Sequence, residues 1–171
     1  MVYSEELCLL LEGLAQQTWE GVAYRFTTAQ RDPREPNTLG ARWNPRNVPA
    51  VYTALSREVA LAEHARRLEV QSPRPSRGEF TLYRVRVSIV GVIDLRDAKV
   101  LETVGVTGEQ LAADDFAACQ MVGGAAAFVN FGGLIVPSVR YPQGDNLVIL
   151  TKNQPADFLF EIEDKESVPL A

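Results

Sequence analysis

The stretch that most constrains this chain runs from Leu39 to Glu63, where a proline-containing loop leads into a short apolar run and then a helical pattern. Pro45 and Pro49 keep the first half of the stretch out of a helix. Ala50–Ala54 (AVYTA) joins small, β-branched and aromatic residues in a run short enough for a buried strand. The sequence therefore predicts a loop and a strand in immediate succession.

A helix is predicted directly after this strand. Ser56 is a natural N-cap, and Glu58 lies favourably in the first helical turn. The residues available for an apolar stripe are Val59, Ala60, Ala62 and Leu68. We expect this loop, strand and helix to bring Arg42, Tyr52 and Glu63 into one neighbourhood.

Length and composition indicate one globular domain over residues 1–171, with a core of about residues 20–162. No apolar run approaches the roughly 20 residues that a membrane-spanning helix requires. The acidic start MVYSEELCLLLEGL lacks the basic region of a signal peptide, so we expect a cytoplasmic protein. Two isolated cysteines and the single histidine, His64, are too few ligands for a zinc site, so we expect no metal.

The charge is unevenly distributed along the chain. Residues 25–86 contain 12 arginines, no lysine and 6 acidic residues, a net charge of +6, whereas the rest of the chain carries −11. The planar fork of arginine binds phosphate or carboxylate groups in a bidentate manner. This favours a compact polyanionic ligand over a long polymer, with solvated surface arginines as the alternative for most of the 12.

The first forty residues predict a helix, a strand and a loop. The helix begins near Ser4 and buries Leu7, Leu10, Leu11 and Leu14. In the strand Val22–Thr27, alternation places Val22, Tyr24 and Phe26 toward the core and Arg25 on the opposite side. Thr28–Thr38 has no periodicity and is predicted to be a surface loop and a candidate mobile lid.

The remaining segments alternate between strand and helix. Gln71–Gly78 is a connector, and Glu79–Val90 is a strand whose phase changes between Leu82 and Tyr83, as at a β-bulge. Val92–Leu95 either continues that strand or forms another, and Asp97–Val106 is a loop or a short helical turn. Thr107 opens a capping box, and the helix after it is predicted to be interrupted at Gly123-Gly124.

The last third is predicted to be rich in strands. The expected strands are Leu134–Val136, Asn146–Thr151 and Asp157–Ile162, with fraying after Glu163. Strands separated irregularly by helices, with several hairpin-length connections, favour an α+β fold over a doubly wound sheet.

Five short motifs occur together in a fixed order: Tyr24-Arg25, Gly40–Asn44 (GARWN), Val51–Ala54 (VYTA), Glu63 in Ala60–Glu63 (ALAE), and Pro137-Ser138. This ordered set, spanning about two thirds of the chain, resembles the RES domain family, which is named for its Arg, Glu and Ser. Ala41 departs from the pattern, where a second glycine is expected.

The resemblance implies a single α+β domain with the split β-sheets of mono-ADP-ribosyltransferases and flanking helices. It implies a toxin of a toxin–antitoxin pair that consumes NAD⁺ as a substrate, needs no cofactor and is held inactive by an Xre-type antitoxin. Carried over, the catalytic residues would be Glu63, Tyr52 and Arg42. The residues that bind NAD⁺ would be Arg25, Tyr24, Arg42, Tyr52 and Ser138.

The chemistry of NAD⁺ cleavage is compatible with one carboxylate. Loss of nicotinamide develops oxocarbenium character on the ribose, as in glycoside hydrolysis. The leaving group is already cationic and departs neutral, so no general acid is needed, and Glu63 would stabilise the ribosyl cation or hold its 2′-hydroxyl. Spacing alone favours a different interpretation, in which Glu63 is a helix-surface residue paired with Arg67 at i+4, and the resemblance to the family reverses that preference.

Each remaining candidate has a functional and a structural interpretation. Arg25 and Arg42 could clamp the pyrophosphate, or could form surface ion pairs, for instance with Asp32 or Glu35. Tyr52 could stack on nicotinamide, or be a core aromatic. Ser138 could contact a phosphate or ribose hydroxyl, or serve only the turn.

Three functions remain open from the sequence. The first is cleavage of NAD⁺ with water or phosphate as acceptor, and the second is transfer of ADP-ribose to a protein. The third is a non-catalytic regulatory or nucleic-acid-binding module that uses the arginine-rich region. The oligomeric state is also open, and a homodimer is the commonest arrangement among soluble oligomers.

Overall fold

The computed structural model describes residues 2–28, 31–70 and 79–169. The helices are α1 (Glu5–Glu12), α2 (Arg57–Val70), α3 (Ala98–Thr103), α4 (Gly108–Ala112) and α5 (Ala117–Phe128), with a 3₁₀ turn η1 at Thr151–Asn153. The strands are β1 (Gln16–Thr28), β2 (Ala50–Ala54), β3 (Glu79–Asp94), β4 (Gly133–Pro137), β5 (Asp145–Leu150) and β6 (Leu159–Pro169). The predicted α+β architecture is confirmed.

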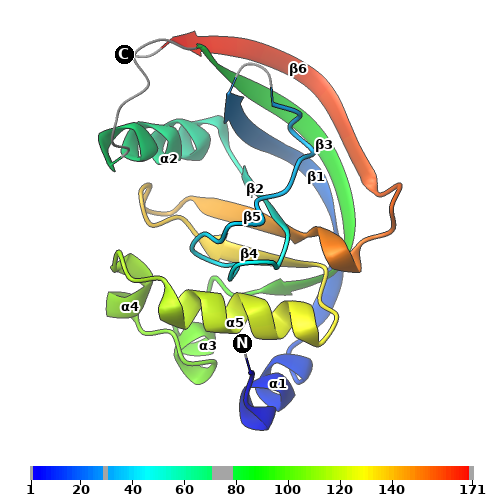
Figure 1. Cartoon of the computed structure of the whole chain (residues 1–171), viewed down its shortest axis with the longest axis vertical. Coiled ribbons are helices and arrows are strands. Elements are labelled where there is room, and N and C mark those ends of the chain that lie inside the picture. Colours follow the sequence, from blue (N-terminus) through cyan, green and yellow to red (C-terminus); the bar gives the residue numbers. More distant parts are fainter. Residues whose placement is uncertain (1, 29–30, 71–78, 170–171) are drawn as a thin grey trace.

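The strands form one six-stranded sheet in the order β1-β2-β5-β4-β3-β6, with β1 also paired along β3. It has two halves, the long curved strands β1, β3 and β6 and the short strands β2, β5 and β4 (Figure 1). The halves are joined by the single pair Tyr24↔Ala54 and by three parallel pairs between β3 and β4. The expected split is therefore present, but within one hydrogen-bonded sheet.

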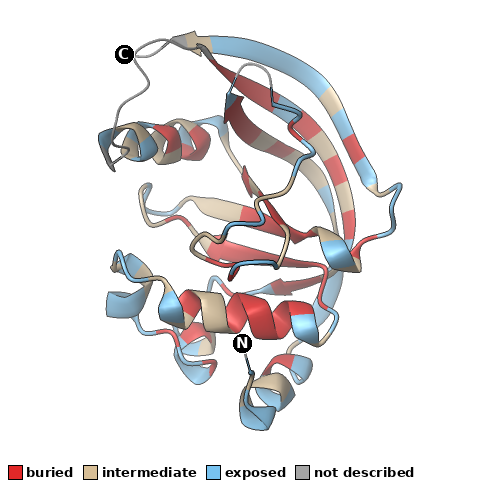
Figure 2. Ribbon diagram, viewed as in Figure 1, coloured by how far each residue is buried: buried red, intermediate tan, exposed pale blue. Residues whose placement is uncertain are grey.

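The core has three parts (Figure 2). The largest lies between β4, β5 and the helices α1, α3 and α5, and includes Leu95, Val122 and Leu134. A second lies between the two halves of the sheet, where both are apolar. The third packs α2 against β1 and β3 through Val59 and Phe26. Helix α2 is thus fixed against the long strands by its own apolar stripe.

The central unit has the predicted form. Ala50–Ala54 is β2, and Val59 N–H donates to Ser56 Oγ (3.2 Å) at the start of α2. The antiparallel register of β2 with β5 places Ala54 opposite Asn146. This register brings the start of β5 next to the strand end from which α2 departs.

Helix α1 begins as predicted, because the Ser4 hydroxyl accepts from Leu7 N–H (3.2 Å). Its apolar face is narrower than expected. Leu11 is fully buried and Leu7 is half-buried, but Leu10 is exposed. Burial of Leu10 was therefore a wrong prediction, since only one edge of this short helix faces α5.

In the strands, one open alternative is decided and two predictions are corrected. The predicted continuation past Gly91 is confirmed: β3 runs unbroken from Glu79 to Asp94, because Gly91 takes a positive φ of 66° and lets the strand continue. The register shift against β6 lies between Arg84 and Val85, two residues beyond the predicted phase change. β6 extends to Pro169, so fraying after Glu163 was wrong: the long partner strand β3 pairs with it throughout.

The predicted break at Gly123-Gly124 is also wrong. Both glycines lie inside α5, and the helical pattern is broken earlier, between α4 and α5 at residues 113–116. A Cβ at Gly123 would lie 1.7 Å from the carbonyl oxygen of Trp43. Gly123 therefore permits α5 to pack directly against the loop that precedes β2. Any side chain at this position would prevent that contact.

Arg25 departs most from expectation in β1. Its side chain is 7% exposed, because the loop that follows β1 folds back over this side of the strand. The predicted loop is confirmed for residues 31–38, and whether it moves is untested; residues 29–30 and the connector Gln71–Gly78 lie outside the described residues. No helix in the described ranges is long and apolar enough to span a membrane.

Candidate active site

Glu63, on α2, is held by two donors from the short strands. Its Oε1 accepts from Ser138 Oγ (2.7 Å) and from Asn146 Nδ2 (3.2 Å). No described residue donates a hydrogen bond to the second oxygen, Oε2. We call Glu63, Ser138 and Asn146 the carboxylate cluster. One oxygen fixes the orientation of the carboxylate, and the other is left free for a ligand.

Ser138 follows β4 and is 9% exposed. Its Oγ accepts from the backbone N–H groups of Arg140 (3.3 Å) and Tyr141 (3.2 Å). Because those bonds use its lone pairs, the hydroxyl proton is directed to Glu63. Ser138 therefore orients the carboxylate and also closes the turn between β4 and β5. Its predicted contact with a phosphate or ribose hydroxyl stays a prediction.

The alternative that Glu63 forms a surface ion pair with Arg67 is wrong. Glu63 is half-buried, and its printed partners are Ser138 and Asn146. Among the described residues no ion pair within 4.0 Å joins it to Arg67. The two charges nevertheless interact. Desolvation lowers the pKa of Arg67, and the negative charge of Glu63 partly offsets that lowering.

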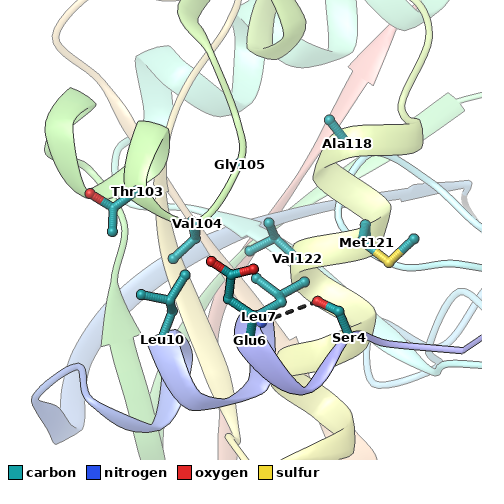
Figure 3. A pocket seen from close by; sticks show the side chains of 10 residues that line it. All are labelled: Ser4, Glu6, Leu7, Leu10, Thr103, Val104, Gly105, Ala118, Met121 and Val122. Carbon is teal, nitrogen blue, oxygen red and sulfur yellow. Dashed lines mark hydrogen bonds between the residues drawn. The ribbon is translucent and has the colours of Figure 1, made fainter.

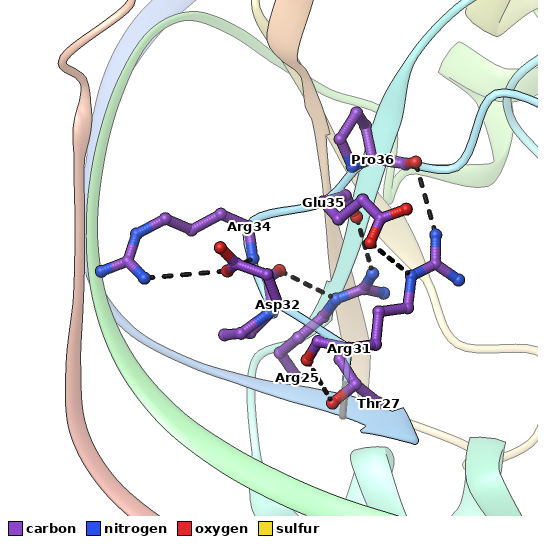
Figure 4. A network of polar contacts seen from close by, with 8 residues as sticks. Arg25, Thr27, Arg31, Asp32, Arg34, Glu35 and Pro36 are labelled. Carbon is purple, nitrogen blue, oxygen red and sulfur yellow. Dashed lines mark hydrogen bonds and ion pairs between the residues drawn. The ribbon is translucent and has the colours of Figure 1, made fainter. Parts of the chain in front are cut away.

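Arg25 holds the loop after β1. Its Nε donates to the carbonyl of Pro33 (3.3 Å) and its Nη2 to that of Glu35 (3.3 Å) (Figure 4). Its Nη1 donates to the carbonyl of Tyr52 (3.2 Å). The surrounding ion pairs are separate, because Arg31 pairs with Glu35 and Arg34 with Asp32. Arg25 thus fastens the loop to β2 through backbone carbonyls.

Burial, together with the nearby Arg67 and Arg31, lowers the pKa of Arg25 to about 10, and Glu35 partly offsets this effect. The guanidinium therefore remains protonated at neutral pH, with its charge compensated by carbonyl dipoles rather than by a carboxylate. It is an electropositive group within the fold, beside the backbone of Tyr52.

Arg42 holds a second loop. Its Nη1 donates to the carbonyls of Leu111 (2.6 Å) and Ala113 (3.0 Å), at the C-terminal end of α4. Its guanidinium also lies over the Phe116 ring, 4.5 Å from the centroid. A cation at these carbonyls is favourable, because the last carbonyls of a helix have no partner within it. Arg42 therefore ties the loop before β2 to the segment between α4 and α5.

Tyr52 fixes the conformation of the loop that carries Arg42. Its hydroxyl accepts from Trp43 N–H (2.9 Å) and donates to Asn44 Oδ1 (2.6 Å). Burial raises the pKa of this hydroxyl, so it stays protonated. Trp43 is buried in the core and anchors the loop rather than lining an open site.

Tyr24 is half-buried on β1, where it pairs with Ala54 and packs against the core beneath α2. It thus lies at the junction between the two halves of the sheet. Arg25 and Tyr52 are joined by a hydrogen bond, whereas Glu63 and Ser138 meet in the carboxylate cluster. The structure therefore brings the six predicted residues together as two neighbouring groups and the loop of Arg42.

Asn146, a member of the cluster, was not predicted. It is the polar residue at the start of the apolar strand β5, in the run Asn146–Leu150 (NLVIL). A polar residue facing a paired strand was a usable signal, but its partner on α2 is 83 residues away in the sequence.

An acidic residue joins two further arginines close to this cluster. Asp114 Oδ1 lies 3.9 Å from Arg66 Nη2 on α2 and 3.9 Å from Arg140 Nη2 after β4. None of the three was predicted as a site residue. Their meeting depends on how the turn between α4 and α5 approaches α2, which no local pattern reveals.

His64 points away from the carboxylate cluster. It is stacked on Phe26 with the centroids 4.2 Å apart and meets the edge of Phe80 at 4.3 Å. Neither ring nitrogen has a hydrogen-bond partner among the described residues, and burial lowers its pKa. The imidazole therefore acts as an apolar core side chain.

A shallow pocket of about 310 Å³ lies elsewhere, between α1, the end of α3 and α5 (Figure 3). Its lining combines apolar residues such as Leu7, Leu10 and Met121 with the polar Glu6 and Thr103. None of the residues that line it belongs to the carboxylate cluster. The carboxylate cluster and this hollow are thus different regions of the surface.

The comparisons with known proteins agree with one another. A family model described as RES domain matches residues 15–171. The NAD(+) phosphorylase MbcT of Mycobacterium tuberculosis and that of Mycobacterium bovis are each 31% identical over 157 residues, covering 84% of this chain and 83% of the relative. The crystal structure of the M. tuberculosis MbcT-MbcA toxin-antitoxin complex matches with a TM-score of 0.86 and 26% identity, over 97% of this chain and 93% of the other.

Proposed function

The chain belongs to the RES domain family, and on that premise we propose that it degrades NAD⁺ by cleaving the bond between nicotinamide and ribose, with inorganic phosphate as acceptor. The observation that carries this is the carboxylate cluster: Glu63 is held through Oε1 by Ser138 and Asn146, and Oε2 is free. The similarity to an NAD(+) phosphorylase favours phosphate over water as the acceptor.

Glu63 would act on the developing charge. As the C–N bond breaks, its electron pair moves onto the pyridinium nitrogen and nicotinamide leaves neutral, while positive charge builds on the ribose. A fixed carboxylate stabilises that charge without reorganising during the step, provided that it is oriented beforehand. Ser138 and Asn146 supply the orientation of Glu63. In this proposal NAD⁺ is the substrate, and the reaction uses no cofactor.

The remaining predicted residues would shape the substrate site. Arg25 and Arg42 each use only part of their five N–H donors on backbone carbonyls, so the others can face the diphosphate of NAD⁺. Tyr24 and Tyr52 lie on adjacent strands beside them, where an aromatic edge can border nicotinamide. We propose that these side chains bind substrate while they hold the loops.

We further propose a biological context for the activity. A protein that removes NAD⁺ must be restrained in its own cell, and the matched structure is a toxin-antitoxin complex. The proposed partner is therefore a separate antitoxin of the Xre type, acting in the cytoplasm on a toxin formed by a single domain, residues 1–171.

Product analysis tests the activity. Purified protein is incubated with NAD⁺ in buffers with and without phosphate, and the products are identified by mass spectrometry. We expect nicotinamide and ADP-ribose 1″-phosphate when phosphate is present, little of either product without it, and at least about 10²-fold slower formation of both by Glu63→Gln. ADP-ribose alone under all conditions would make the protein a hydrolase, and NAD⁺ that stays intact in the presence of phosphate would refute the proposal.

A further inference from the structure

Two arginines from different elements converge beside the carboxylate cluster. Arg66 comes from α2, and Arg140 from the connection between β4 and β5. Each has its Nη2 3.9 Å from the same oxygen of Asp114. The side chain of Asp114 is 86% exposed, whereas those of Arg66 and Arg140 are 34% and 25% exposed. The cations are thus partly sheltered and their anion is not.

The convergence is incomplete as an ion-pair network. Charge-assisted bonds of arginine to carboxylate are typically about 2.7–2.9 Å long, and both distances to Asp114 exceed that range. The Nε of Arg66 is buried and has no partner among the described residues. The two guanidinium groups therefore retain donors for an anion that reaches further between them than Asp114 does.

The pair is coupled to Glu63 through both elements. Arg66 is three residues after Glu63, so the two side chains lie on adjacent turns of the same face of α2. On the other side, Arg140 N–H donates to Ser138 Oγ, and Ser138 in turn donates to Glu63. An anion bound by the pair would therefore be fixed relative to the carboxylate.

We propose that Arg66 and Arg140 bind the phosphate acceptor, and that Asp114 occupies this position until phosphate displaces it. This rests on the proposed function, because it names the site of the second substrate. An oxygen of HPO₄²⁻ forms the bond to C1″ of the ribose as the C–N bond breaks onto nicotinamide. The product is ADP-ribose 1″-phosphate, whose phosphate monoester retains the proton or releases it to water.

The chemistry of the pair fits a phosphate dianion. Two guanidinium forks from opposite sides offer several N–H donors to a tetrahedral anion. The carboxylates present, Asp114 at 3.9 Å from both arginines and Glu69 at 3.3 Å from Arg66 Nη1, satisfy only part of them. The diphosphate of NAD⁺ presents the same chemistry. The two sources are separable, because a site for the acceptor changes the dependence on phosphate and a site for the diphosphate changes the dependence on NAD⁺.

The test compares Arg140→Gln with a control variant, Arg86→Gln. In the wild-type protein Arg86 forms an ion pair with Glu163 on the surface of β3 and β6. Initial rates are measured against phosphate and against NAD⁺ at constant ionic strength. We expect Arg140→Gln to raise KM for phosphate about tenfold or more, as the loss of a charge-assisted bond implies, with KM for NAD⁺ within about twofold of wild type. Arg86→Gln should match wild type.

Asp114→Asn gives a second arm that works in the opposite direction. Removing the internal anion should lower KM for phosphate about threefold, on the scale of an exposed ion pair, and Glu109→Gln in α4 should leave it unchanged. If Arg140→Gln raises only KM for NAD⁺, or Asp114→Asn leaves KM for phosphate unchanged, the proposal is wrong.

Calorimetric titration with inorganic phosphate, without NAD⁺, separates this proposal from the activity itself. Phosphate should bind to wild type and to Arg86→Gln, and more weakly to Arg140→Gln. Wild type that binds phosphate in this way but leaves NAD⁺ intact would refute the proposed function and retain the anion site. Equal binding by all three proteins would refute the anion site.

Discussion

Two neighbouring regions of this protein use charged residues in opposite ways. In the carboxylate cluster, Glu63 takes two hydrogen bonds on one oxygen and leaves the other free, and all three members lie on or beside regular elements. In the loops held by Arg25 and Arg42, the charged groups donate to backbone carbonyls of irregular segments. The first region leaves a carboxylate oxygen without a donor among the described residues, and the second uses charge to hold loops.

This contrast separates two roles that a sequence motif merges. The Glu63 carboxylate on α2 is fixed by Ser138, just after β4, and by Asn146 in β5. It can be replaced at little cost to folding, because few backbone groups depend on it. A buried guanidinium that serves three carbonyls cannot, because its removal leaves those carbonyls without partners. The two regions should therefore respond differently to mutation, in activity on one side and in stability on the other.

The largest expected effect is on catalysis at Glu63. Glu63→Gln keeps the shape but removes the negative charge, so we expect kcat for NAD⁺ cleavage to fall about 10²- to 10³-fold, the scale for loss of a preorganised electrostatic group. The melting temperature should stay within about 2 °C, as usual for a change that breaks no core packing. Glu58→Gln, on the exposed first turn of α2, is the control. A large loss of stability in Glu63→Gln would remove the contrast.

Arg25 should show the opposite balance. Arg25→Ala leaves three carbonyls of the loop and of β2 without a donor, so we expect the free energy of unfolding to fall by about 2–4 kcal/mol. For a domain of this size that corresponds to a melting temperature lower by about 5–10 °C. Arg31→Gln removes an exposed ion pair with Glu35 and an exposed hydrogen bond to the Pro36 carbonyl (3.5 Å), and it should change the melting temperature by less than about 2 °C.

Urea denaturation of the two variants and wild type measures this difference directly. Activity is assayed well below the transition, so that unfolded protein does not contribute. If Arg25→Ala is as stable as Arg31→Gln but has lost activity, Arg25 acts on substrate alone and the loop interpretation fails.

Asn146 should lie between these extremes. Asn146→Ala removes one of two donors to Glu63 Oε1, and we expect kcat to fall about tenfold with KM for NAD⁺ little changed. Asn146→Asp has the same shape but places a second negative charge against Glu63, so its kcat should fall further than that of Asn146→Ala. Added to Glu63→Gln, the change Asn146→Ala should lower kcat much less than it does in the wild-type protein, because the two residues act as a unit. Additive losses would show that Asn146 acts independently of Glu63.

The sequence predicted the local unit well because its signals are local. Pro45, the run Ala50–Ala54 and the Ser56 cap each act within a few residues, and the loop, strand and helix follow from them. The pairing of Glu63 with Ser138 spans 75 residues, and only the order of motifs shared with a known family placed them in one site. Local patterns alone favoured a position for Glu63 on the surface.

The failures share one physical cause, which is contact between distant segments. Gly123 reads locally as a helix breaker, but it lies within α5 because the Trp43 backbone packs against it. Arg25 reads as solvent-facing by alternation, but a loop covers that side of β1. Asn146, Arg140 and Asp114 could not be assigned because the tertiary approach of β5 and of the turn after α4 to α2 brings them to the site.

The smallest expected effect concerns His64, which adjoins Glu63 in the sequence but belongs to the core. Burial between Phe26 and Phe80, and to a lesser extent Arg67, lowers its pKa below the ordinary value of 6.5. The folded state therefore favours neutral imidazole, so the associated stability is complete above about pH 6.5 and is lost as the pH falls below it. His64→Leu should remove this dependence, so that its melting temperature falls less than that of wild type between pH 7 and pH 5, by an amount equivalent to less than about 1 kcal/mol. Parallel melting curves over that range would show that the imidazole is equally easy to protonate in the folded and unfolded chain, and that the core position of His64 differs from the one described.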